Sequence, residues 1–220
     1  MNRLRRGMKK LKGLAKETEK LLLKLSGSKL LEGFTFVGGS ALAFHLEHRL
    51  SEDIDLFSWK KEIDKENIVE SIREMKLVFQ IMSGGSKQIN MIADNVSLTF
   101  FAQGWDVLKD REQVTGNLYV ASLGTLAAMK INTLFLRARY RDYYDLYVLN
   151  KEVFSFSELF EIGHKIMPEL SMKLFQTSLV YTKDIKEDNI HHLSPRYETS
   201  IEEIVTHFRM EIDNWIREQN

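Results

Sequence analysis

The stretch GGSALAFHLEHRLSEDIDLFS, residues 38–58, constrains the fold more than any other part of the chain. It follows FTFV, residues 34–37, which is typical of a short buried strand. After the two glycines, a helical pattern runs from Ser40 to His48. Residues 53–57, DIDLF, alternate polar and apolar side chains, as a half-buried strand does. The chain is therefore expected to run strand, glycine turn, helix, strand over this short distance.

The two aspartates of this stretch are candidate metal ligands. Asp53 and Asp55 are two residues apart on a predicted strand, so their carboxylates point to the same face. Carboxylate oxygens suit Mg²⁺, and the repulsion between two of them is costly unless a cation is present. The alternative is the solvent-facing edge of an ordinary half-buried strand.

The glycine pair favours the first interpretation. A strand that ends at Gly38 and Gly39 and turns into a helix at Ser40 exposes backbone N–H groups and a helix N-terminus to an anion. Structural turn glycines would explain that pattern by themselves. The two features in this order, joined by one helix, favour a nucleotide site in which divalent metal offsets the charge of a triphosphate.

The rest of the first half predicts a mixed α/β region. A charged helix is expected over about 64–75, followed by three antiparallel strands in KLVFQIM, QINMIA and VSLTFF, joined by the turns SGGSK and DN. A further strand near 117–121 leads to Ser122, a candidate N-cap for the helix that carries Lys130.

The second half predicts helices throughout. One contains RDYYDLYVL, and three more follow from about residue 151: SELFEIGHKIM behind Ser157, PELSMKLFQTSLVY from Pro168, and IEEIVTHFRMEIDNWIREQ. We predict an α+β fold with two parts. Residues 1–150 form a core with an N-terminal helix, and residues 151–220 form a helical C-terminal region packed on it.

Composition excludes several kinds of site. The chain contains no cysteine, which rules out disulfides, thiolate zinc sites and cysteine nucleophiles, so a metal must bind oxygen or imidazole. No apolar run approaches the roughly 18 residues that cross a bilayer, and the basic start lacks the apolar core of a signal peptide. We therefore expect a cytoplasmic protein without a membrane partner.

Charge is balanced overall but uneven along the chain. The 31 basic and 31 acidic residues cancel, so the whole chain does not indicate a polyanion partner. Residues 1–16 contain no acid and seven cations: Arg3, Arg5, Arg6, Lys9, Lys10, Lys12 and Lys16. This run could contact nucleic acid phosphates, or it could be the solvated face of a first helix over about residues 8–25.

The stretch GGSALAFHLEHRLSEDIDLF resembles the glycine-serine and paired-aspartate motifs of the DNA polymerase β nucleotidyltransferase superfamily. Its phrase R-x-S-x-D-I-D-L-F is particularly similar to the AbiEii/AbiGii toxin branch. A second segment, LGTLAAMKINTLFLRARYRDYYDLYVL, resembles the later lysine and R-D-x-x-D-L motifs of that branch. The resemblance covers about residues 34–150 and implies a nucleotidyltransferase fold, a small mixed sheet flanked by helices.

The resemblance also implies roles for single residues. The glycine-serine turn, Gly38, Gly39 and Ser40, would hold the triphosphate, while Asp53 and Asp55 would bind Mg²⁺, or Mn²⁺ in its place. Lys130 would contact nucleotide phosphates. Asp142 would be the late acidic residue of the site, with Asp145 as the less favoured choice.

Several of these residues have a structural alternative. Lys130 lies among apolar neighbours, where an unpaired ammonium is costly, yet it could also extend from the edge of that face to solvent. The arginines at 137, 139 and 141 could close a helix junction through ion pairs or contact phosphate. His45 and His48 have metal-compatible spacing but no evident third ligand, so surface or partly buried roles are expected. The tyrosines near Asp142 are expected mainly to pack.

One position departs from the family pattern. Many polymerase-β-like enzymes add a third carboxylate from a central strand, and the comparable stretch VSLTFF has Thr99 at that place. Asp94, next to Asn95, is expected to be a turn residue. The number of metals and the activation of the acceptor hydroxyl are therefore open, unless Asp142 or Asp145 supplies a base.

Three functions follow for testing. The favoured one is Mg²⁺-dependent transfer of a nucleoside monophosphate from an NTP to a hydroxyl of RNA, including tRNA, or of protein, by the toxin of a toxin-antitoxin or phage-defence pair with a cognate antitoxin. The second is a catalytically degenerate nucleotide-binding or protein-interaction module of the same fold, suggested by Thr99. The third is a kinase-like transfer of a terminal phosphoryl group.

Overall fold

A computed structural model of the chain describes residues 11–186 and 189–219. It divides into two compact units, Met1–Ser122 and Leu123–Asn220, called the N-terminal and C-terminal units below. The predicted functional division after residue 150 differs, because it counts residues 123–150, which hold the first helix of the C-terminal unit and most of its second, with the core. That division stays a prediction.

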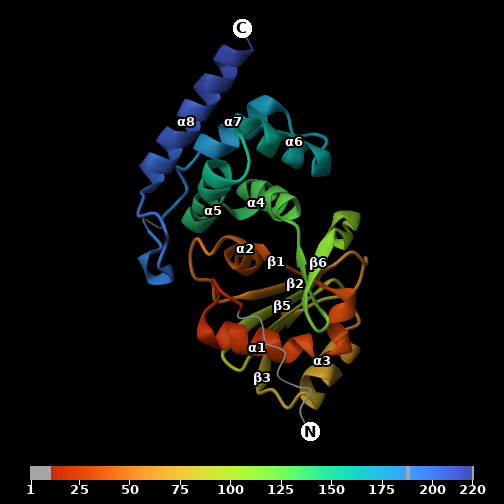
Figure 1. Cartoon of the computed structure of the whole chain (residues 1–220). Helices are drawn as coiled ribbons and strands as arrows, with labels where there is room; N and C mark the ends of the chain where they lie inside the picture. The colour runs from red at the N-terminus through yellow and green to blue at the C-terminus, as the bar shows by residue number, and fades with distance from the viewer. Residues whose placement is uncertain (1–10, 187–188, 220) are drawn as a thin grey trace. The chain divides into compact units, whose positions relative to one another are not determined.

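The N-terminal unit is built on one mixed sheet of seven strands (Figure 1). In spatial order these are β3 (Phe79–Gly84), β4 (Gln88–Ala93), β5 (Val96–Ala102), β2 (Ile54–Ser58), β1 (Thr35–Val37), β7 (Leu118–Ala121) and β6 (Arg111–Thr115). β2 pairs antiparallel with β1 and parallel with β5, while β3, β4 and β5 form an antiparallel meander. The predicted strands are thus confirmed, and β6 is an addition.

Helices cover both faces of this sheet. The N-terminal unit contains α1 (Lys16–Ser26), α2 (Gly38–Leu46), α3 (Lys65–Glu74) and the 3₁₀ helices η1 (Lys29–Gly33) and η2 (Asp106–Lys109). Figure 1 shows α2 on one side of the sheet and α1 and α3 on the other. Alternation in β2 buries Ile54 and Leu56 completely and leaves Asp55 half-buried. The face that carries Asp55 is therefore separate from the main apolar core.

The first helix begins later than predicted. Residues 11–15 are not helical, and Gly13 has a φ of +78° with the backbone of Ala43 so close that a Cβ would lie 2.0 Å from its carbonyl oxygen. The segment instead pairs with Ser51, whose N–H donates to Gly13 and whose carbonyl accepts from Ala15. Tertiary pairing overrides the helical pattern here. The cations at 3, 5, 6, 9 and 10 lie outside the described residues.

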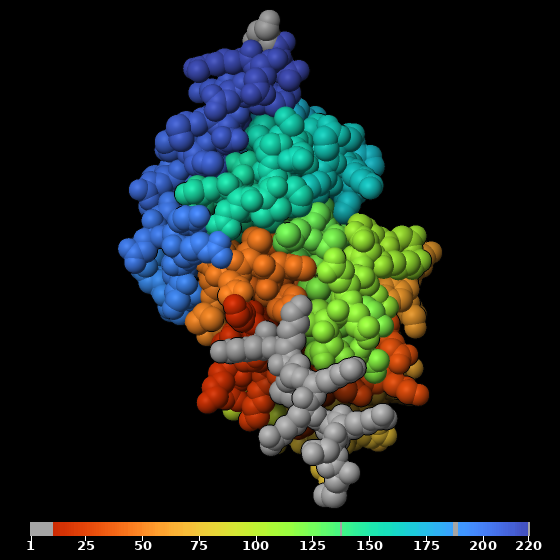
Figure 2. Space-filling model, in the orientation of Figure 1, coloured from red at the N-terminus to blue at the C-terminus, as the bar shows by residue number. Residues whose placement is uncertain are grey.

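The β6–β7 hairpin forms the edge of the sheet opposite β3. Its turn at Gly116 has a φ of +51°, and a Cβ there would lie 2.4 Å from the carbonyl of Ser26 at the end of α1. Asn117 donates its N–H to that same carbonyl at 2.7 Å. In Figure 2 the hairpin forms part of the surface, in green, and adjoins red residues of the first helices.

The C-terminal unit is helical within its described residues. It contains α4 (Leu123–Arg137), α5 (Tyr140–Glu152), α6 (Phe156–Ile166), α7 (Met172–Val180), η3 (His191–Leu193) and α8 (Ile201–Glu218). Apolar side chains of these helices make a separate core that includes Ile131, Leu149, Leu159, Phe175 and Phe208, each fully buried. The predicted helical content is confirmed.

Two helix starts in this unit were predicted wrongly. α6 is capped by Ser155, not Ser157, because Ser155 and Glu158 form a reciprocal capping box. α7 begins at Met172 behind the N-cap Ser171, not at Pro168. Pro168 lies in a turn held by Leu170, whose N–H donates to Met167 and whose carbonyl accepts from the ring of His164.

Candidate functional site

The first turn of α2 lies against the carboxylate of Asp55. Gly38 has a φ of +76°, and a Cβ built on it would lie 2.3 Å from Asp55 Oδ2. A residue with a side chain would be strained at this backbone conformation, and the Asp55 carboxylate would have to move to make room for it. Register explains the proximity, because Val37, the last residue of β1, pairs with Asp55 in β2.

Gly39 lies equally close to a charged group. A Cβ at this position would be 2.5 Å from Nη2 of Arg49, whose side chain is buried and donates to the carbonyl of Leu50 at 3.0 Å. Because both residues lack a side chain, the backbone of the first turn of α2 can lie close to the Asp55 carboxylate and to the Arg49 guanidinium. Arg49 is therefore part of the immediate surroundings of the turn, where it could orient the aspartates or contact substrate.

Ser40 holds the site together rather than facing solvent. It is buried, and its hydroxyl hydrogen-bonds Ser51 Oγ at 2.8 Å and the carbonyl of Asp53. The loop before β2 is therefore tied to the first turn of α2. Ser51 is the serine of the phrase R-x-S-x-D-I-D-L-F, but no role was predicted for it; it lies between Arg49 and Asp53 and also anchors residues 13–15. A role of the Ser40 hydroxyl in triphosphate binding stays a prediction.

The N-terminus of α2 retains anion-binding capacity through its backbone. Val37 occupies the N-cap, and its side chain makes no capping hydrogen bond to the helix. The N–H groups of a first turn lack intrahelical partners and carry the positive end of the helix dipole. Backbone N–H groups of Gly39 and Ser40 are therefore suited to phosphate oxygens.

Asp53 and Asp55 fit a divalent metal. Both are half-buried, Asp55 lies in β2 and Asp53 directly precedes that strand, and Gly38 leaves the space beside Asp55 clear of a side chain. Two carboxylates are enough for Mg²⁺ when waters and substrate phosphates complete its shell. The described residues contain no group of three or more His, Cys, Asp or Glu side chains arranged for a metal. They therefore fit a metal shared with substrate better than a protein-only cage.

Thr99 occupies the place next to Asp55. β2 and β5 pair in parallel, and the register sets Asp55 opposite Thr99 on the same sheet face. Related enzymes often have a carboxylate at the position of Thr99. In this protein Thr99 is therefore the direct neighbour of Asp55, a predicted metal ligand. Its hydroxyl donates to Oδ1 of Asn90 at 3.2 Å. Asn90 was not singled out from the sequence.

In the C-terminal unit, Lys130 forms a buried ion cluster with two aspartates, called the Lys130 cluster below. Its Nζ lies 2.8 Å from Oδ1 of Asp142 and 2.6 Å from Oδ2 of Asp145. The side chain of Asp145 is fully buried, and those of Lys130 and Asp142 are 10% and 6% exposed. The two candidates for the late acidic residue therefore share one cation, and the solvent-extended alternative for Lys130 is wrong.

Helix geometry places the Lys130 cluster. Lys130 lies on α4, while Asp142 and Asp145 lie three residues apart on α5 and so share a face. Asp142 also accepts from the N–H of Arg139 at the start of α5 through its other oxygen, at 3.1 Å. Asp142 thus has a capping role besides its ion pair. Its predicted catalytic role and the phosphate contact of Lys130 stay predictions.

The remaining candidates have structural contacts. His45 donates from Nε2 to the carbonyl of Ala121 at 2.9 Å, and His48 is fully buried. Tyr143 and Tyr144 are buried, and burial is the main cause that raises the pKa of both hydroxyls, that of Tyr143 to about 12. Tyr143 donates to the carbonyl of Ser178 at 3.1 Å. Packing is thus confirmed as the main use of these tyrosines.

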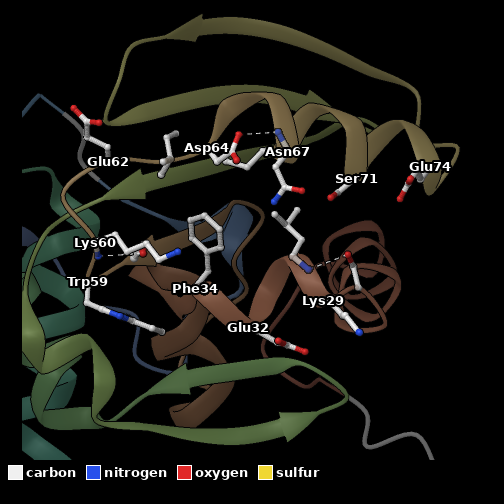
Figure 3. A pocket seen from close by; sticks show the side chains of 16 residues that line it. Lys29, Glu32, Phe34, Trp59, Lys60, Glu62, Asp64, Asn67, Ser71 and Glu74 are labelled. Carbon is white, nitrogen blue, oxygen red and sulfur yellow. Dashed lines mark hydrogen bonds between the residues drawn. The ribbon is translucent and has the colours of Figure 1, made fainter.

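A separate pocket of about 660 Å³ opens at the far end of β1 and β2 (Figure 3). Figure 3 shows Phe34 between α3 and η1, with Trp59 and Lys60 to one side. Arg111 stacks on the Trp59 ring at 4.6 Å and donates to the carbonyl of Phe34 at 2.7 Å. None of the predicted site residues lines this pocket.

Comparison with solved structures defines the fold class. A candidate nucleotidyltransferase from H. pylori matches with a TM-score of 0.58 and 18% identity, covering 90% of this chain and 93% of that chain. MenT4, a nucleotidyltransferase toxin from Mycobacterium tuberculosis H37Rv, matches with a TM-score of 0.55 and 15% identity, covering 87% and 82%. The predicted nucleotidyltransferase fold is confirmed.

The sequence comparison defines the family. The model of the nucleotidyl transferase AbiEii toxin family, of type IV toxin-antitoxin systems, matches residues 20–107 and 105–165. The chain belongs to this family, as its motifs predicted. An uncharacterized protein of Aquifex aeolicus (strain VF5) is 26% identical over 194 residues, which cover 87% of this chain and 92% of that protein. Family and fold together support a transferase and a nucleotidyl-transferring toxin.

The lengths and hydropathy of the helices were compared with what a membrane span requires. Among residues 11–186 and 189–219, none of the helices is long and apolar enough to cross a membrane.

Proposed function

We propose that this protein transfers a nucleoside monophosphate from an NTP to an acceptor hydroxyl, with Mg²⁺ bound by Asp53 and Asp55. The acceptor oxygen forms a bond to the α-phosphorus, the bond from that phosphorus to the bridging oxygen breaks, and pyrophosphate leaves. The acceptor proton passes to solvent. Bound Mg²⁺, or Mn²⁺, would supply positive charge that offsets the charge of the phosphate oxygens.

The observation that carries this proposal is the contact of Gly38 with the Asp55 carboxylate. Asp55 Oδ2 lies 2.3 Å from the place of a Cβ on Gly38, so a helix N-terminus and a metal-binding carboxylate meet without a side chain between them. N–H groups of Gly39 and Ser40 would bind phosphate oxygens, while the aspartates face the same anion through the metal. The pairing of Ser40 with Asp53 would keep these groups in register.

Lys130 and Asp142 enter the proposal through the family resemblance. Lys130 would contact nucleotide phosphates, and Asp142, or Asp145, would be the late acidic residue. Their mutual pairing gives a competing structural role, so their variants must be tested for stability as well as activity.

Incubation with labelled NTPs, Mg²⁺ and either total cellular RNA or total protein tests the proposal. We expect label in RNA or protein together with released pyrophosphate, and loss of both with Asp55→Asn. Asp106→Asn is a matched control, because Asp106 is exposed and pairs with its helix neighbour Lys109 in the same unit. Measurable NTP binding without any transfer would contradict the enzyme and favour the degenerate module.

The degenerate module has one observation in its favour, the neutral Thr99 beside Asp55. Such a protein should tolerate Asp55→Asn with little change in its cellular effect. Release of nucleoside diphosphate instead of pyrophosphate would favour a kinase-like transfer.

The toxin role implies a partner and a location. We infer a cognate antitoxin and action in the cytoplasm. Expression of the wild-type chain should arrest growth, a small neighbouring gene should relieve that arrest, and Asp55→Asn should not arrest growth. Arrest that persists with Asp55→Asn would contradict toxicity through transfer.

A further inference from the structure

A row of polar side chains crosses four strands next to Asp55. Strand register sets Asp55 in β2 opposite Thr99 in β5, Thr99 opposite Asn90 in β4, and Asn90 opposite Ser83 in β3. Register partners share a sheet face, so all four point to the face of the predicted metal ligands. We call Thr99, Asn90 and Ser83 the Thr99 row; none of them carries a charge.

Hydrogen bonds fix the orientation of Asn90 in this row. Its Oδ1 accepts from the Thr99 hydroxyl at 3.2 Å and from the Gln88 amide at 2.8 Å. Its Nδ2 donates to Ser83 Oγ at 2.8 Å. In this orientation the carbonyl of Asn90 faces Thr99 and Gln88, and its amide group faces Ser83.

This orientation determines what Thr99 offers beside Asp55. A hydroxyl has one proton and two lone pairs. Because Asn90 takes the proton, the oxygen of Thr99 presents lone pairs, and Thr99 is half-buried rather than enclosed. The position next to Asp55 is therefore suited to accept a hydrogen bond, and a neutral threonine cannot serve as a base there.

Aromatic rings border the next position of the same face. Phe57 in β2 pairs in register with Phe101 in β5, two residues beyond Asp55 and Thr99. Their ring centroids are 5.0 Å apart in an edge arrangement, and both side chains are half-buried. An aromatic surface beside a neutral hydrogen-bond acceptor fits a nucleoside, with its base against the rings.

We propose that Thr99, oriented by Asn90, accepts a hydrogen bond from the acceptor hydroxyl of an RNA end and so holds it beside Asp55. Thr99 is then a substrate-binding residue and Asn90 a positioning residue. The proposal rests on the proposed nucleotidyl transfer and specifies its acceptor site. A terminal phosphate finds no cation in the Thr99 row, so RNA ending in a hydroxyl is the preferred acceptor.

Steady-state kinetics with total cellular RNA and labelled NTP test this site. Thr99→Val, which keeps the shape and removes the hydroxyl, should raise the RNA KM by roughly three- to tenfold, as expected for one neutral hydrogen bond. NTP affinity should not change. Thr99→Ser should restore the wild-type KM, and Ser97→Ala, on the exposed part of the same face of β5, is the matched control.

Asn90→Leu separates positioning from packing. It should raise the RNA KM by less than Thr99→Val does, and it should add nothing when combined with Thr99→Val, because Asn90 acts through the hydroxyl. Thermal unfolding of each variant checks the fold. If either variant does not fold, the affinity of the wild type for RNA ending in a ribonucleotide, compared with the same RNA ending in a 2′,3′-dideoxynucleotide, decides, and equal affinities overturn the proposal.

The outcomes distinguish this inference from the proposed function. An active wild type whose Thr99→Val variant keeps the RNA KM, or changes NTP affinity equally, overturns the acceptor site alone. Label found in protein and not in RNA also overturns it. A wild type that transfers no label to RNA or protein overturns the proposed function, and the acceptor site with it.

Discussion

Two pairs of aspartates in this protein have opposite surroundings. Asp53 and Asp55, in the N-terminal unit, are half-buried beside a glycine turn and a helix N-terminus. Asp142 and Asp145, in the C-terminal unit, are buried against the ammonium of Lys130. The aspartates of the N-terminal unit are thus placed to bind a metal ion from solution, whereas those of the C-terminal unit pair with a lysine of the protein itself. The predictions below test this contrast in order of expected effect.

The largest effect is expected at Asp55. Asp55→Asn removes one charged metal ligand, and we expect transfer activity to fall by about a thousandfold or more, on the order of 4 kcal/mol of transition-state stabilisation. The free energy of unfolding is measured as well, so that a loss of activity can be distinguished from a loss of the fold. Label incorporation and urea unfolding measure the two quantities. Unchanged activity would remove Asp55 from the site.

A large loss of stability is expected at the Lys130 cluster. Lys130→Met leaves two buried carboxylates without their cation, which costs about 3–5 kcal/mol in comparable buried pairs. Urea unfolding measures the loss. Combining Lys130→Met with Asp142→Asn and Asp145→Asn removes the uncompensated charge and should recover part of it. A stable Lys130→Met variant that has lost transfer would instead give Lys130 a direct role with the nucleotide.

A smaller effect is expected at Gly38. Gly38→Ala must adopt a φ of +76° and displace Asp55 Oδ2, which lies 2.3 Å from the new Cβ. We expect a loss of about 1–3 kcal/mol in stability, by analogy with other strained backbone positions, together with a clear drop in transfer. Gly33→Ala is the control, since no atom lies within 4 Å of its Cβ. Equal behaviour of the two variants would contradict the close approach at Asp55.

The smallest effect concerns Tyr143, whose pKa rises to about 12 mainly because the hydroxyl is buried. Below pH 10 both folded and unfolded chains keep this proton, so stability is unaffected. Between pH 10 and 12 the unfolded chain releases it while the folded chain retains it, so stability decreases as pH rises. Urea unfolding at several alkaline pH values should show a shallower decrease for Tyr143→Phe. Identical slopes would contradict the buried hydroxyl.

Local patterns determined much of the N-terminal unit. Alternation in DIDLF predicted the strand that carries Asp55, and FTFV followed by two glycines predicted the strand and turn that the structure contains. β6, with sequence REQVT, was missed because it is an edge strand that pairs only with β7, so its side chains show no burial pattern. The start of α1 was missed because Gly13 and Ser51 pair through backbone groups that no side-chain pattern records.

Sequence alone determined the residue types at the candidate site, their order and the family, since glycine turns, strand alternation and helix periods are local properties of the chain. Tertiary structure decided which of those residues meet. Gly38 against Asp55, Thr99 beside Asp55, and Lys130 between Asp142 and Asp145 all depend on strand register or helix packing between segments far apart in sequence. Such contacts arise only when the whole sheet or helix bundle buries its apolar surface. A local pattern can therefore predict which residues form the site, but the folded core determines the distances between them.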